Sequence, residues 1–94
     1  MTLAELKASI AADRPPEGAG DALAALWWAA KGDWDRAHHH AQQDESADGA
    51  WVHAHLHRIE GDLSNAGGWY QRAGKPAADG PLAEEWDRIA ESLL

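Results

Sequence analysis

A short motif occurs twice in this chain, and the second copy begins 29 residues after the first. The copies are residues 32–37, which read GDWDRA, and residues 61–66, which read GDLSNA. In both, the glycine is suited to end one helix and the aspartate after it is suited to cap the next. Each copy therefore predicts a helical hairpin. A single hairpin cannot bury its apolar face alone, so we expect the two to stack.

Capping residues and apolar spacing predict one further helix on each side of the hairpins. Thr2 and Glu5 form a capping box at the start of the chain. An apolar stripe at helical spacing marks the last segment, and no segment shows the alternation of a strand. We therefore predict one all-α domain over residues 1–94, with five to six helices. The expected order is a flanking helix at about 2–12, stacked hairpins at about 21–43 and 50–74, and a flanking helix at about 81–94.

Composition narrows the classes of partner. The formal net charge is −8, without a basic run, which disfavours nucleic acid and anionic membrane surfaces as partners. Cysteine is absent, which excludes disulfides and thiolate metal sites. No leader-like segment and no apolar run of about 20 residues is present, so we expect a cytoplasmic protein. Six tryptophans supply large apolar side chains for the core of a small domain.

We call the turn formed by residues 32–37 the first elbow and the turn formed by residues 61–66 the second elbow. The first elbow, together with Tyr70 and Ala73 near the end of the second hairpin, resembles the tetratricopeptide repeat. That family places a glycine–acidic–aromatic turn between its helices and an aromatic before a small residue near the end of the second. The resemblance covers roughly residues 21–74 and implies a right-handed stack that binds proteins or peptides. Residues 57–66 (HRIEGDLSNA) and 69–74 (WYQRAG) are also similar to a family of uncharacterised short proteins, a likeness that implies no particular reaction.

The fourth expected helix carries a candidate metal site. His53, His57 and Glu60 are spaced i, i+4, i+7, so their side chains can converge on a divalent transition metal. The alternative is structural: both imidazoles pack against the next helix and bond to Tyr70, Asn65 or Asp62. The consecutive residues 38–40 are all histidine and fan out around their helix. At most one can face the next hairpin, and we expect a solvated run.

Two further sets of side chains are candidates for binding. By analogy with the repeat family, Trp51, His55 and Arg58 line the concave face and form a ligand or partner surface, unless Arg58 pairs with Asp62 or Glu60. A polar cluster surrounds the second elbow, where Asp62 is expected to cap a helix, Asn65 to bond a backbone group, and Glu60 to pair with Arg72. The members of this cluster are Glu60, Asp62, Asn65, Tyr70 and Arg72.

No nucleophile motif or phosphate-binding glycine loop is present in the sequence. The leading hypothesis is therefore a non-catalytic interaction module that binds a protein, a peptide or a second copy of itself. The alternative is a metal- or small-ligand-binding protein, or an enzyme, that uses His53, His57 and Glu60. A third hypothesis makes the histidines a pH sensor.

Overall fold

The protein is all-α, as predicted. A computed structural model describes residues 1–94 and contains helices but no strand. None of the helices combines the length and the apolar character that crossing a lipid bilayer requires. The helices are α1 (Leu3–Ser9), α2 (Asp21–Ala30), α3 (Trp34–Gln43), α4 (Ala47–Ile59), α5 (Leu63–Ala73) and α6 (Leu82–Leu93).

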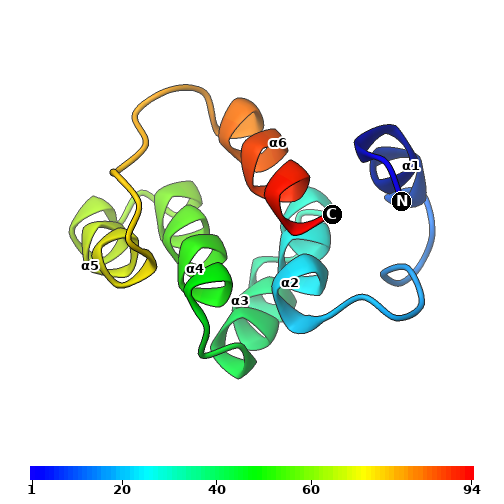
Figure 1. Ribbon diagram of the computed structural model, residues 1–94, viewed down its shortest axis with the longest axis horizontal. Coiled ribbons are helices and arrows are strands. Elements are labelled where there is room, and N and C mark those ends of the chain that lie inside the picture. Colours follow the sequence, from blue (N-terminus) through cyan, green and yellow to red (C-terminus); the bar gives the residue numbers. More distant parts are fainter.

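Four helices lie side by side in one layer. The hairpin of α2 and α3 packs against the hairpin of α4 and α5, and α3 and α4 form the joint between the two. Figure 1 shows α5 at one end of this layer and α1 beyond the other end. Apolar side chains from α1, α2, α3, α4 and α6 meet in the main core, where Trp27 is fully buried.

The duplicated motif forms the same turn twice. In the first copy Gly32 adopts φ 84°, the amide of Asp33 donates to the carbonyl of Trp28, and the Asp33 carboxylate accepts from the Arg36 amide. This geometry ends α2 and caps α3 within a few residues. In the second copy Gly61 adopts φ 83°, the amide of Asp62 donates to the carbonyl of His57, and the Asp62 carboxylate accepts from the Asn65 amide.

We expect alanine at Gly32 or at Gly61 to lower the free energy of unfolding by about 1–2 kcal/mol. A Cβ at either position meets nothing within 4 Å, so the loss comes from the left-handed backbone alone. Gly67 is the matched control, because it lies inside α5 with equally open surroundings and without a positive φ. Gly67→Ala is expected to stabilise by about 0.5–1 kcal/mol. Urea unfolding of the three variants checks this, and a neutral Gly61→Ala would contradict it.

Two helix boundaries differ from expectation. α1 ends at Ser9 instead of near residue 12. α4 begins at Ala47, earlier than the expected residue 50, because the Ser46 side chain accepts from the Gly49 amide and caps the helix. Gly49 permits this start, since a Cβ there would lie 2.0 Å from the carbonyl oxygen of Asp44.

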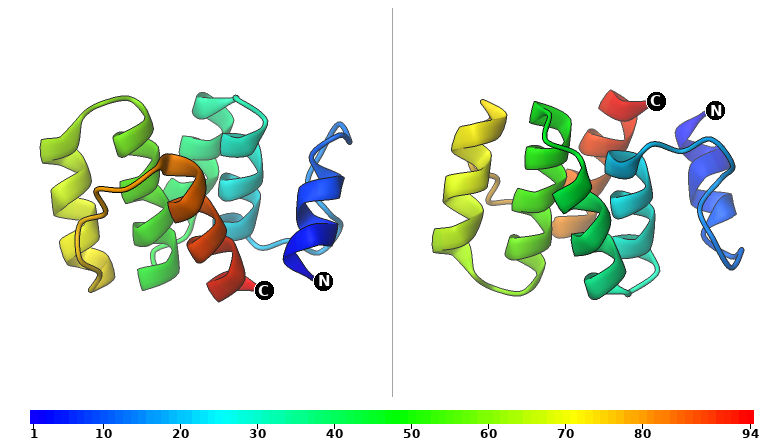
Figure 2. Two further views of the ribbon diagram at one scale, coloured as in Figure 1. Left: turned by 90° about the horizontal axis from the view of Figure 1, so that it is seen from above. Right: turned by 90° about the horizontal axis from the view of Figure 1, so that it is seen from below.

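The position of α6 is a correction to the expected order, in which the last helix flanks the end of the stack. Instead, α6 crosses one face of the layer and packs against α4, α2 and α1 (Figure 2). Its apolar stripe explains this, because Ile89 is fully buried there and Trp86 donates its ring N–H to the carbonyl of Leu26 at 2.8 Å. The free end of the stack at α5 stays open, and Leu63 there is 67% exposed.

Candidate functional site

Three histidines meet at the joint between the hairpins. His38 comes from α3, and His53 and His57 come from successive turns of α4. One ring nitrogen from each lies within 4.8 Å of the others. The ring centroids of His38 and His53 are 4.6 Å apart with the rings edge to face, and those of His53 and His57 are 4.9 Å apart.

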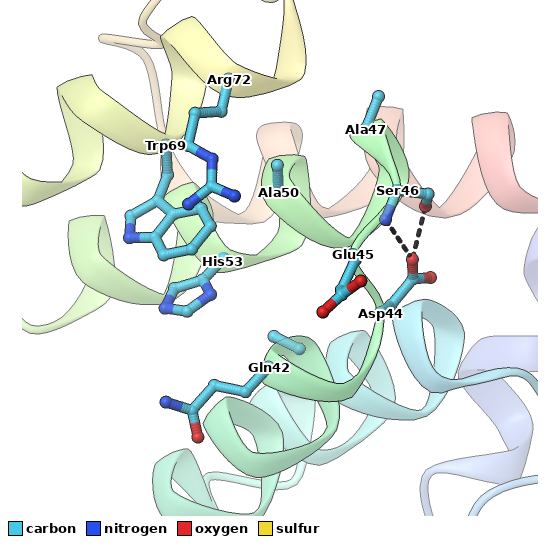
Figure 3. Close-up of a pocket in the computed structure, with 10 residues that line it drawn as sticks. Gln42, Asp44, Glu45, Ser46, Ala47, Ala50, His53, Trp69 and Arg72 are labelled. Atoms are coloured by element: carbon cyan, nitrogen blue, oxygen red, sulfur yellow. Dashed lines mark hydrogen bonds between the residues drawn. The ribbon is translucent and has the colours of Figure 1, made fainter.

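Tryptophans hold two of these rings in place. The Trp34 ring stacks on His38 with centroids 4.7 Å apart, and its N–H donates to the Leu56 carbonyl at 2.7 Å. The Trp69 ring stacks on His53 with centroids 3.7 Å apart. Figure 3 shows this second stack, with the guanidinium of Arg72 beside Trp69. The imidazoles are therefore fixed by aromatic packing from both hairpins.

The surroundings of His38 and His53 favour their neutral forms. Burial, and then the neighbouring His38 and His57, lower the pKa of His53 to about 4. Burial and His57 also lower the pKa of His38. The Nδ1 atom of His53 is buried and has no hydrogen-bond partner. The Nδ1 atom of His57 lies 2.5 Å from a carboxylate oxygen of Glu60.

This cluster differs in one residue from the predicted metal site of His53, His57 and Glu60. The third residue near His53 and His57 is His38, while Glu60 forms a hydrogen bond with His57 outside the cluster. His38 belongs to the run expected to be solvated, yet it is half-buried against α4. Three consecutive histidines point in three directions, and the sequence carries no signal for which one faces α4. The alternative bonds from the imidazoles to Tyr70, Asn65 or Asp62 do not form.

A polar cavity of about 300 Å³ opens beside His53 (Figure 3). Its walls carry the carboxylates of Asp44 and Glu45 on one side and the guanidinium of Arg72 on the other. Arg72 forms no ion pair, and its guanidinium lies 4.4 Å from the Trp69 ring centroid. A cavity with both charges suits a small polar molecule.

The expected partner surface of Trp51, His55 and Arg58 is covered by the chain itself. His55 is only 2% exposed, and its Nδ1–H donates to the Glu85 carboxylate of α6 at 2.6 Å. Arg58 pairs with the same carboxylate at 2.9 Å and forms no ion pair with Asp62 or Glu60. Trp51 lies against the connection from α5 to α6, where Lys75 is 4.3 Å from its ring centroid. The face that was expected to bind a partner is therefore covered by α6 and the segment before it.

Glu85 is the centre of a buried polar network. It is 1% exposed and accepts from His55, Arg58 and the hydroxyl of Tyr70. Burial alone would favour the neutral acid, but the hydrogen bonds from these three residues hold the pKa of Glu85 at about 2. Burial and Glu85 raise the pKa of Tyr70, and Glu85 raises the pKa of Arg58 against the effect of burial. Sequence reasoning missed Glu85, because an acid in the first turn of a helix is ordinarily solvated.

The predicted polar cluster around the second elbow is split among different contacts. Asp62 caps α5 by accepting from the backbone amide of Asn65. Tyr70 belongs to the Glu85 network. Glu60 bonds to His57, while Arg72 lies over Trp69, so the expected pair of Glu60 with Arg72 does not form.

An apolar groove lies between α1 and the helices α2, α4 and α6, which we call the α1 groove. Its volume is about 530 Å³, and most of the residues that line it are apolar. Ile59 and Leu82, each 39% exposed, lie on its walls. Lys7 and Asp87 form an ion pair of 3.0 Å within the lining. The full lining is Lys7, Ile10, Ala29, Ala30, His55, Ile59, Leu82, Ala83, Trp86 and Asp87.

We compared the chain with models of protein families, with curated proteins and with solved structures, and none of them matches it. The α1 groove and the histidine cluster are therefore the features that bear on what this protein binds.

Proposed function

We propose that this protein is a non-catalytic helical-repeat interaction module of the cytoplasm, which binds the apolar side of a partner protein's helix in the α1 groove. The observation that carries the proposal is an open apolar groove on a chain whose net charge is −8. Open apolar surface is unfavourable in water and is typical of a binding site. The lack of cysteine fits a reducing compartment.

The shape of the groove favours a helical occupant. Its walls come from four helices, with small alanine side chains of α2 and α6 between the larger Ile59, Leu82 and Trp86. Small residues between large ones leave room for apolar side chains that project from one face of a helix. Because Lys7 and Asp87 already pair with each other, the groove offers little free charge to a partner.

Photo-crosslinking at Ile59 tests the proposal. A photoreactive residue in place of Ile59, in the full chain within the cells that make it, is expected to yield a crosslinked product of defined mass. Leu63 is the matched control, because it is an exposed apolar residue outside the groove. A second substitution, Leu82→Lys in the part of the groove formed by α6, is expected to reduce the yield at least about tenfold.

The product also identifies the class of occupant. A mass of twice that of the chain identifies a second copy, which sedimentation of the purified protein must then reproduce. Equal yields at Ile59 and Leu63, or a yield that Leu82→Lys leaves unchanged, would overturn the proposal. Leu82 is partly exposed, so its substitution is expected to change stability by no more than about 1 kcal/mol.

A further inference from the structure

We propose that His38, His53 and His57 bind one divalent transition-metal ion of the zinc class at the joint between the two hairpins. This inference is independent of the α1 groove, which shares none of these residues. The ion would connect α3 of one hairpin to α4 of the other, since His38 lies on α3 and the other two ligands on α4.

The spacing of the ring nitrogens is close to that of a three-histidine site. Tetrahedral zinc with Zn–N bonds of about 2.0–2.1 Å holds its ligand nitrogens about 3.4 Å apart. The three nitrogens here already lie within 4.8 Å of one another. Closing the remaining gap needs shifts of about 1 Å, and His38 is the least buried of the three rings. Imidazole nitrogens are ligands that zinc, nickel and copper ions accept.

His57 carries the support that metal-binding histidines usually have. A carboxylate can only accept, so the Nδ1–H of His57 donates to Glu60 and leaves Nε2 with its lone pair free. A carboxylate behind a ligating histidine fixes its tautomer and raises its basicity. Glu60 therefore has a defined place in the site without touching the metal: it positions His57.

His53 contributes the second independent observation. The residue is 3% exposed, and its Nδ1 atom is buried without a hydrogen-bond partner. Buried polar atoms in native proteins are nearly always satisfied, so an orphan nitrogen inside a cluster of imidazoles indicates a missing ligand.

A second group, formed by His57, Glu60 and Asp62, competes for the same imidazole. Its two carboxylates are exposed, and exposed acids commonly gather without a metal. The three-imidazole set suits a zinc-class ion better, because such ions favour nitrogen over carboxylate oxygen more than magnesium or calcium does. Three protein ligands leave one coordination position for water or an added ligand.

Titration of chelator-stripped, untagged protein with zinc chloride tests the site. Calorimetry is expected to give one ion per chain, and the tetrahedral absorption bands of cobalt(II) are expected to appear at the same stoichiometry. His38→Ala is expected to weaken zinc binding at least about tenfold. His39→Ala is the matched control, because His39 is exposed, lies next in the same run and belongs to neither metal group. It is expected to leave the affinity unchanged.

Glu60→Gln and His38→Ala together separate the two candidate groups. For the three-histidine site, Glu60→Gln is expected to weaken binding by about 10–100-fold, the usual effect of losing a carboxylate behind a ligand, while His38→Ala weakens it as well. Loss with Glu60→Gln but not with His38→Ala would assign the ion to the carboxylate group and overturn the proposal. Equal losses with His38→Ala and His39→Ala, or no zinc binding by the native chain, would also overturn it.

Nuclear magnetic resonance of the imidazole nitrogens provides a readout that needs no variant. Zinc is expected to shift the ring resonances of three of the six histidines, those of His38, His53 and His57. Shifts confined to residues 38–40 would show adventitious binding to the histidine run and would contradict the proposal.

Discussion

Replacing Glu85 with alanine is expected to lower the free energy of unfolding by about 3–5 kcal/mol. The carboxylate is 1% exposed and is shared by His55, Arg58 and Tyr70. Its removal leaves a largely buried guanidinium without its counter-charge and two buried donors without an acceptor. A domain of this size has a total stability of about 5–14 kcal/mol, so the loss is a large part of it.

Thermal unfolding followed by circular dichroism checks this expectation, and the melting temperature should fall by about 15 °C or more. Glu84→Ala is the matched control, because Glu84 precedes Glu85 in the same helical turn but is exposed. We expect it to cost about 0.5 kcal/mol. Similar losses in the two variants would show that the network contributes nothing beyond a surface charge.

The same network predicts how the free energy of unfolding falls at acidic pH. The pKa of Glu85 is about 2 in the folded chain, against 4.5 for an ordinary glutamate. The folded state therefore binds fewer protons, and the stabilisation is complete above pH 4.5 and is lost as the pH falls towards 2. The loss is up to about 3 kcal/mol. Urea unfolding between pH 5 and pH 2.5 should show a shallower decline for Glu85→Gln than for the native chain; parallel declines would contradict it.

Replacing Trp27 with alanine is expected to destabilise the protein by about 3–5 kcal/mol. Trp27 is fully buried in the main core, and its ring N–H donates to the hydroxyl of Ser9 at 3.0 Å, which ties α1 to α2. The Trp28 ring packs edge-on against it with centroids 4.9 Å apart. The alanine variant would leave a cavity that surrounding side chains can fill only in part.

Trp27→Phe separates packing from hydrogen bonding. It keeps an aromatic ring in the core but removes the N–H, so it is expected to cost about half as much as the alanine variant or less. Guanidinium unfolding of both variants checks the order. If phenylalanine cost as much as alanine, the bond to Ser9 would outweigh the burial of the ring, contrary to this account.

The two elbows could be predicted because their causes are local. Gly61 and Asp62 act on groups a few residues away in the chain, and the same is true of the first copy. Most helix boundaries could be predicted for the same reason. The exceptions are the end of α1, at Ser9, and the start of α4, where the cap from Ser46 extends the helix towards the first hairpin.

The candidate site could be predicted only in part. His53 and His57 are one helical turn apart, so their proximity follows from helix geometry. The inclusion of His38 depends on the rotation of α3 about its axis, which is set by the packing of α3 against α4 and by the bond from the Trp34 ring N–H to the Leu56 carbonyl of α4. Glu60 stays outside the cluster because its carboxylate bonds to His57, the histidine closest to it along the chain.

The sequence by itself determined that the chain forms helical hairpins joined by two equivalent turns, since glycine and aspartate impose these turns through bonds between near neighbours. Only the tertiary structure decided that α6 covers α2 and α4, that Glu85 neutralises Arg58 there, and that His38 joins the other two histidines. The physical reason is that an apolar stripe specifies which side of a helix must be buried but not which partner buries it. That choice depends on how all the faces fit together at once.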